Sequence, residues 1–162
     1  MQINQLSHFL KLGAVCVSVF GLAACAKLED RARGYLASSV DVFAVVDGQL
    51  LLGEADLYDN RTATLTMRTG LAVTPALSCS GRLTRTGTTS AALEMHCNTG
   101  LTLALSAAML AETQGYAYGQ SSSGQLASLT LGLESARAVS YLRAPAGQQL
   151  VALPKKPYIE LR

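Results

Sequence analysis

The sequence predicts an all-β fold, a small antiparallel barrel or sandwich of about eight strands. Two observations carry this prediction: apolar and polar residues alternate with a period of two, and turn residues recur about every ten positions. The size agrees, because 162 residues is the length of one ordinary domain. A hydrophobic content of 49% also argues against a disordered chain.

The clearest strands have one apolar face and one polar face, as in an antiparallel sheet with one side buried and one side in water. Turn residues separate them, including the Asp-Gly pair at 47–48, the segment 59–61 and the Gly- and Ser-rich segment 119–124. Strands are expected at 40–46, 50–57, 62–68, 101–106 and 127–133. A short helix is expected near 107–112, which is rich in Ala, Leu and Met.

The N-terminus has the pattern of an export signal. A polar start with Lys11 as its one basic residue precedes an apolar run at 12–24, interrupted by Ser18 alone. This run is shorter than the roughly 20 apolar residues of a membrane-spanning helix. Its length is typical of the apolar region of a secretory signal peptide.

The run ends at 22–25 in Leu-Ala-Ala-Cys, which resembles the lipobox of bacterial lipoproteins. The resemblance implies cleavage before Cys25 and attachment of diacylglycerol and a fatty acid, such as palmitate, to that residue. The next residues are Ala and Lys rather than Asp, and the resemblance to lipoproteins then implies an outer-membrane location facing the periplasm. Cys16 is not an alternative lipidation site, because the valine before it is too bulky for the cleavage pocket. The alternative is an ordinary signal peptide that leaves Cys25 as a free thiol.

These patterns divide the chain into four parts. Residues 1–24 form the signal peptide, and the charged segment 25–34 forms a lipidated tether. Residues 35–143 form the β-domain, and 144–162 form a proline-containing tail.

Two cysteines remain for an exported domain, and they predict one disulfide between Cys79 and Cys97. A hairpin turn centred on Thr88 sets these cysteines opposite one another. The same register pairs residues of matching character: Leu83 with Leu93 and Gly81 with Met95 on the cysteine face, and Arg82 with Glu94 as an ion pair and Ser80 with His96 on the other face. A shift by one residue would turn the whole apolar set outward.

The residues favour no catalytic or metal chemistry. A net charge of +2 excludes the basic footprint of a nucleic-acid-binding protein. Cys79, His96 and Cys97 make a poor metal site, because consecutive strand residues point to opposite faces. The sequence also lacks a nucleophile elbow and a dinucleotide-binding glycine pattern. We therefore expect no catalytic residues, no metal ligands and no cofactor.

Two features are candidates for contact with another protein. Tyr116 and Tyr118 share one strand face, where they either cover the end of the core or form an exposed aromatic pair. The tail is too apolar for a solvated segment, so it either packs on its own domain or docks on a partner as an extended strand. Its candidate contacts are Leu150, Leu153, Tyr158 and Ile159.

The segments Cys79-Ser80-Gly81 and 94–100 resemble small, uncharacterised β-rich envelope lipoproteins, which implies fold and location. The first hypothesis is therefore a lipid-anchored accessory domain that binds another envelope protein. A second is an inhibitor of an envelope-attacking hydrolase, because Ser122-Ser123-Gly124 resembles the Ser-x-Gly loop of the membrane-bound lysozyme inhibitors. A third is a carrier of a small hydrophobic ligand.

Overall fold

The computed structural model describes residues 38–70, 75–155 and 158–162. All of them belong to one compact unit, Ser38–Arg162. The predicted signal peptide, the tether and the lipidation of Cys25 lie outside the described residues. Within the described ranges, no helix is both long enough and apolar enough to cross a membrane.

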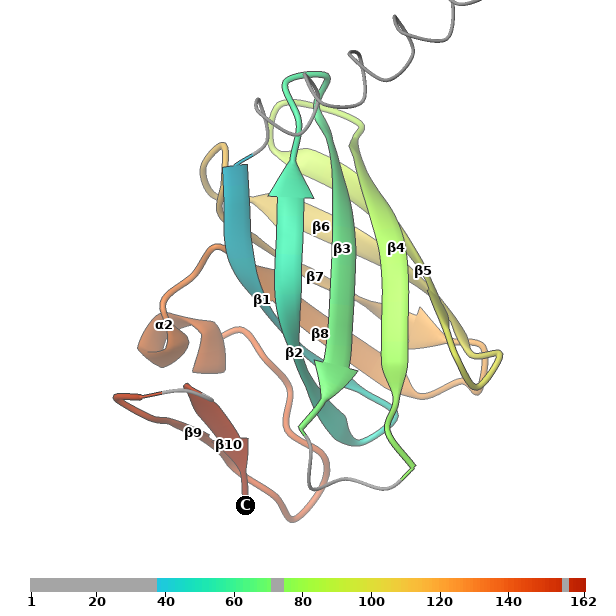
Figure 1. The fold of residues 1–162 in the computed structure, drawn as a ribbon, viewed down its shortest axis with the longest axis vertical. Helices are drawn as coiled ribbons and strands as arrows, with labels where there is room; N and C mark the ends of the chain where they lie inside the picture. The colour runs from blue at the N-terminus through green and yellow to red at the C-terminus, as the bar shows by residue number, and fades with distance from the viewer. Residues whose placement is uncertain (1–37, 71–74, 156–157) are drawn as a thin grey trace, which may run out of the picture. The chain divides into compact units, whose positions relative to one another are not determined.

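The unit is a closed antiparallel barrel of eight strands, so the all-β prediction is confirmed and the barrel is the correct alternative. Each strand pairs with the next along the chain, and β8 returns to pair with β1 between Val42–Leu131 and Val45–Ser128 (Figure 1). The strands are β1 (Ser38–Val46), β2 (Gln49–Leu57), β3 (Thr62–Thr69), β4 (Ser78–Arg85), β5 (Ser90–Cys97), β6 (Thr102–Met109), β7 (Gly115–Ser121) and β8 (Leu126–Leu131).

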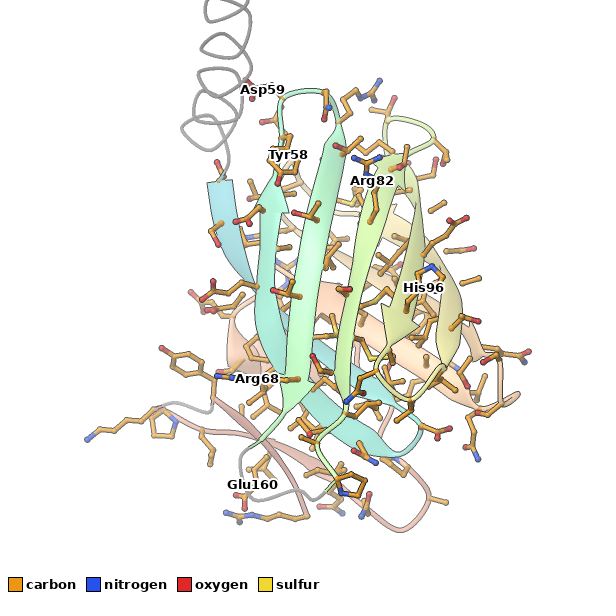
Figure 2. All side chains as sticks on the ribbon, turned by 45° about the vertical axis from the view of Figure 1, so that its right-hand side comes forward. Tyr58, Asp59, Arg68, Arg82, His96 and Glu160 are labelled. Carbon is orange, nitrogen blue, oxygen red and sulfur yellow. A yellow bond between two sulfur atoms is a disulfide. The ribbon has the colours of Figure 1, made fainter. Side chains whose placement is uncertain are left out.

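The barrel interior is filled by apolar side chains from all eight strands. Leu51, Leu93 and Leu129 are fully buried in this cluster. The outer face carries polar side chains, and Figure 2 shows Arg82 and His96 on the outside of the sheet. This arrangement is the reverse of an outer-membrane barrel, which turns its apolar side chains outward to lipid.

The predicted hairpin has the predicted register. β4 and β5 pair with Cys79 opposite Cys97 and Leu83 opposite Leu93, and the two cysteines form a disulfide across 18 positions of sequence. Arg82 and Glu94 are cross-strand neighbours, but the described residues include no ion pair between them. That part of the prediction is wrong. Two long, exposed side chains gain little from pairing in water, so register alone does not hold them together.

Inward-facing glycines let neighbouring strands approach closely. A Cβ at Gly53 on β2 would overlap the carbonyl oxygen of Thr66 on β3. A Cβ at Gly81 on β4 would overlap the carbonyl oxygen of Glu94 on β5. Glycines at such positions allow a sheet to curve into a small barrel.

The expected helix near 107–112 is wrong. β6 continues to Met109, with Ala107 and Met109 buried, and the chain then turns toward β7. Pairing with β5 on one side and β7 on the other overrides the helical propensity of the Ala- and Leu-rich segment. The short helix lies elsewhere, at α2 (Ser135–Val139).

A second apolar core lies outside the barrel. The C-terminal segment contributes α2 and a hairpin of β9 (Leu150–Ala152) and β10 (Ile159–Leu161), which Figure 1 shows beside the barrel. Its members come from β1 and from that segment: Phe43, Val45, Leu133, Ala138, Leu142 and Ile159. The tail therefore packs on its own domain.

This packing also changes the outer face of β8. Ser128 and Thr130 alternate with the core residues of β8 and were expected to face water, yet both are buried. Each hydroxyl has a partner: Ser128 Oγ accepts the Arg143 N–H at 2.9 Å, and Thr130 Oγ1 lies 3.5 Å from the Phe43 carbonyl. The expectation of a wetted face on β8 is wrong because the C-terminal segment covers it.

Candidate functional site

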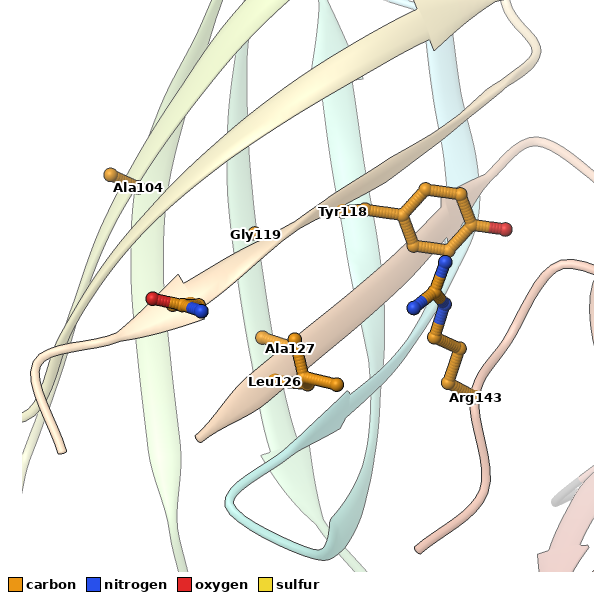
Figure 3. Close-up of a pocket in the computed structure, with 7 residues that line it drawn as sticks. Ala104, Tyr118, Gly119, Leu126, Ala127 and Arg143 are labelled. Atoms are coloured by element: carbon orange, nitrogen blue, oxygen red, sulfur yellow. The ribbon is translucent and has the colours of Figure 1, made fainter. Parts of the chain in front are cut away.

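The outer face of the barrel is hollowed over β6, β7 and β8. This outer-face groove has a volume of about 590 Å³, and Figure 3 shows residues that line it. Seven described residues line it: Ala104, Tyr118, Gly119, Gln120, Leu126, Ala127 and Arg143. A volume of this size lies within the roughly 300–1,000 Å³ of ordinary small-ligand sites.

The groove follows from the residue pattern of three strands. Alternation on β7 turns Tyr118 and Gln120 outward, where they stand opposite Ser106 and Ala104 of β6. Of these two β6 residues, Ala104 lines the groove, and its short side chain leaves space beside Gln120. Leu126 at the start of β8 stands opposite Gln120 and forms another wall.

Arg143 reaches the groove from the segment after α2. Its guanidinium carbon lies 4.6 Å from the centroid of the Tyr118 ring, and Figure 3 shows the two groups side by side. The backbone N–H of Arg143 donates to Ser128 Oγ, and the Tyr118 hydroxyl donates to the Tyr141 carbonyl oxygen at 2.7 Å. These contacts hold both the arginine backbone and its aromatic neighbour.

The electrostatic character of the groove is simple. Of the seven lining residues, Arg143 alone carries a charge. Among the described residues, no carboxylate pairs with its guanidinium. Leu126 is 60% exposed, which is unusual for a large apolar side chain on a barrel whose other leucines are mostly buried. The groove therefore combines an unpaired cation, an aromatic ring and an exposed apolar side chain.

The two predicted strand tyrosines both turn outward and are half-buried. Tyr116 stacks on Tyr141 with ring centroids 4.7 Å apart, and it lies 5.4 Å from Tyr118. Tyr116 is thus covered by the chain's own C-terminal segment. Tyr118 faces the groove, and its contact with a partner stays a prediction.

The four predicted tail residues do not line the groove. Ile159 is 1% exposed in the second core, with Leu150 and Tyr158 packed against that core. The N–H of Leu153 donates to the carbonyl of Tyr158 at 2.6 Å. Ile159 is therefore unavailable as an exposed contact, because its side chain is occupied within its own domain.

The Ser122-Ser123-Gly124 segment forms the turn between β7 and β8. Ser123 Oγ donates to the Asp47 carboxylate at 2.9 Å, which joins this turn to the β1–β2 turn. Ser122 Oγ accepts the Thr102 N–H at 3.1 Å. Both hydroxyl oxygens thus make hydrogen bonds within the molecule, which fix the turn against its neighbours.

The metal alternative for the two cysteines fails on their chemistry. Their sulfur atoms are joined to one another and cannot act as thiolate ligands. His96 lies on the outer face, opposite Ser80. In the part of the chain that the structure describes, no group of three or more His, Cys, Asp or Glu residues could hold a metal ion.

Sequence reasoning missed most of the groove. Gln120 could have been predicted, because strand alternation places it on the same outer face as Tyr118. Leu126 could also have been predicted, since it is an apolar residue on the outer face that Ser128 and Thr130 share. Arg143 carried no usable signal, because it lies in an irregular segment that no local periodicity places.

Comparison with known proteins identifies no family. No family model and no curated protein matches the chain. Among solved structures, a redesigned β-barrel is 17% identical, with a TM-score of 0.48 over 64% of this chain and 95% of that one. Another redesigned β-barrel, mFAP1 bound to DFHBI, is 15% identical, with a TM-score of 0.49 over 64% of this chain and 99% of that one.

Proposed function

We propose that this chain is a lipid-anchored envelope protein whose barrel is a non-catalytic binding domain for another envelope protein. One observation carries the binding role: the barrel interior is filled by the chain's own side chains, whereas the outer-face groove presents an exposed Leu126 and an unpaired Arg143. The contact surface is the groove.

The packed interior argues against a carrier whose ligand lies inside the barrel. A ligand there would displace fully buried side chains such as Leu51, Leu93 and Leu129. Removing large apolar side chains from a core costs roughly 2–5 kcal/mol each. The bonded serines of the β7–β8 turn likewise give the inhibitor hypothesis no support.

The anchor rests on the lipobox resemblance at Cys25, and the disulfide is consistent with it. Disulfides persist in oxidising compartments such as the periplasm, where a processed lipoprotein is found. One acyl chain binds a membrane only marginally, whereas several chains hold a protein stably. Multiple acylation at Cys25 would keep the barrel at the membrane without a spanning segment.

Replacing Cys25 with serine should abolish lipid attachment, because serine lacks the sulfur that takes the diacylglycerol. We expect Cys25→Ser to lose incorporation of labelled palmitate and to leave the membrane fraction. Cys16→Ser is the matched control, since it removes a cysteine of the same signal segment and should change neither measurement. Labelled palmitate retained in Cys25→Ser would contradict the proposed anchor.

A photoreactive amino acid in place of Leu126 should cross-link one envelope protein in intact cells. The expectation follows from the exposure of Leu126 at the groove wall. The control carries the same group in place of Ser80, an exposed outer-face position on β4. Mass spectrometry should identify one adduct from position 126 that is absent from position 80. The same adducts from both positions would contradict a role for the groove.

A further inference from the structure

The charge in the groove restricts what it can bind. Arg143 is its one charged lining residue and has no carboxylate partner among the described residues. A guanidinium presents a planar set of N–H donors that matches the two oxygens of a carboxylate. The complementary group on a ligand is therefore an anion with that geometry.

The arginine is held ready for such a ligand. Its guanidinium lies over the Tyr118 ring, and the Tyr118 hydroxyl is tied to the Tyr141 carbonyl. Stacking on an aromatic face leaves the edge N–H groups free to donate. The stacking contact favours one orientation of this exposed side chain, which reduces the entropy lost when a ligand binds.

The rest of the groove favours an apolar group beside that anion. Leu126 offers exposed hydrocarbon, and the short side chain of Ala104 forms the floor on the β6 side. The Gln120 side chain stands between them and can hydrogen-bond a peptide unit. The volume of about 590 Å³ is in the range of ordinary ligand sites, and the groove is open to solvent, as an extended peptide requires.

The charges at the two sides of the floor differ. Glu94 on β5 is the cross-strand neighbour of Ala104 on the outer face. Glu94 stands opposite Arg82 on β4, so that side carries charges of both signs, whereas Arg143 is the one charged lining residue of the groove. An extended chain would thus lie with its carboxylate at Arg143 and its remaining residues toward β6.

We infer that the groove recognises a short extended peptide of the partner that carries a carboxylate next to an apolar side chain. The inference rests on the proposed function, and it adds the chemistry of the partner. The carboxylate belongs either to a C-terminal residue or to an internal Asp or Glu, and both use the same bond to Arg143.

Three synthetic peptides test this chemistry on the purified, detergent-solubilised full chain. They are N-acetyl-Ala-Leu-Leu with a free C-terminal acid, the same peptide as an amide, and N-acetyl-Leu-Glu-Leu amide. Calorimetric titration should show at least about 10-fold tighter binding of one or both acids than of the neutral amide, with the difference shrinking at high salt. Binding of the free acid assigns a C-terminus, and binding of the Glu peptide assigns an internal residue.

Arg143→Gln should bring the affinity for the acids down to that of the amide. Arg137→Gln is the matched control, an exposed arginine of the same C-terminal segment that lies outside the groove, and it should bind like the wild type. Arg143→Lys should give an intermediate loss, because lysine keeps the charge without the planar fork. Thermal unfolding of all three variants checks that the barrel remains folded.

Equal affinity for acid and amide, or an equal loss in Arg137→Gln, would overturn the inference. Binding of vesicles of phosphatidylglycerol in place of the peptides would also overturn it. A failure of the proposed function can be distinguished from a failure of this inference. If the cross-link from position 126 persists while the peptides do not discriminate, the barrel binds a partner by other chemistry; if both fail, the groove is not a binding surface.

Discussion

Reducing the Cys79–Cys97 disulfide should lower the free energy of unfolding of the barrel by about 3 kcal/mol. The disulfide closes a loop across 18 positions of sequence, and this loop restricts the unfolded chain more than the folded one. Urea unfolding of the oxidised and reduced protein measures the difference. A fall in the denaturation midpoint is expected after reduction.

The double variant Cys79→Ala/Cys97→Ala provides a test that does not depend on a reductant. It should match the reduced protein or be somewhat less stable, because both sulfur atoms lie in the barrel core. The hairpin of β4 and β5 should still form, since its register is also set by pairs such as Leu83 with Leu93. An unchanged midpoint after confirmed reduction would contradict the stabilising role of the disulfide.

Replacing Ile159 with alanine should release the C-terminal hairpin from the barrel. Ile159 is 1% exposed and is the β10 side chain buried in the second core. Truncating such a residue costs about 2–5 kcal/mol. The hairpin of β9 and β10 forms a separate two-stranded sheet, so we expect most of the lost free energy to appear as local unfolding of this hairpin.

Hydrogen exchange followed by mass spectrometry measures this effect. Amide protection should fall in 149–155 and 158–162 while the strands of the barrel stay protected. Val151→Ala is the matched control, because Val151 lies in the same hairpin, is half-buried and does not belong to the second core. Equal loss of protection in both variants, or none in Ile159→Ala, would show that Ile159 does not fasten the tail.

Much of the barrel was predictable because strand alternation is a local property. Ala63, Leu65 and Met67 turn inward on β3, as their spacing predicts, and the two-residue turn at 47–48 has positive φ at both positions. The β4–β5 register was predictable for the same reason, since a single turn fixes every pair in a hairpin. The segment 107–112 was misassigned because its propensity favours helix, whereas its two neighbouring strands impose extended pairing.

The candidate site was less predictable, because its parts come from separate segments. Tyr118 and Gln120 belong to one strand, and their shared face follows from alternation. The backbone N–H of Arg143 donates a hydrogen bond to Ser128, and its guanidinium lies over the Tyr118 ring. Irregular chain separates Arg143 from both of these residues. The position of Arg143 depends on how α2 and the C-terminal segment pack.

The pattern of residues along the chain was sufficient to predict about eight short strands, the inward side chains of the clearest of them, and one bridged hairpin. It could not distinguish a barrel from a sandwich, because closure depends on β1 pairing with β8, far apart in sequence. Long-range packing likewise buried Ser128 and Thr130 and joined the tail to Phe43 and Val45. The periodicity of a strand predicts which of its two faces a side chain lies on. Which other segment covers that face depends on the free energy of the whole fold, so it cannot be predicted from the strand alone.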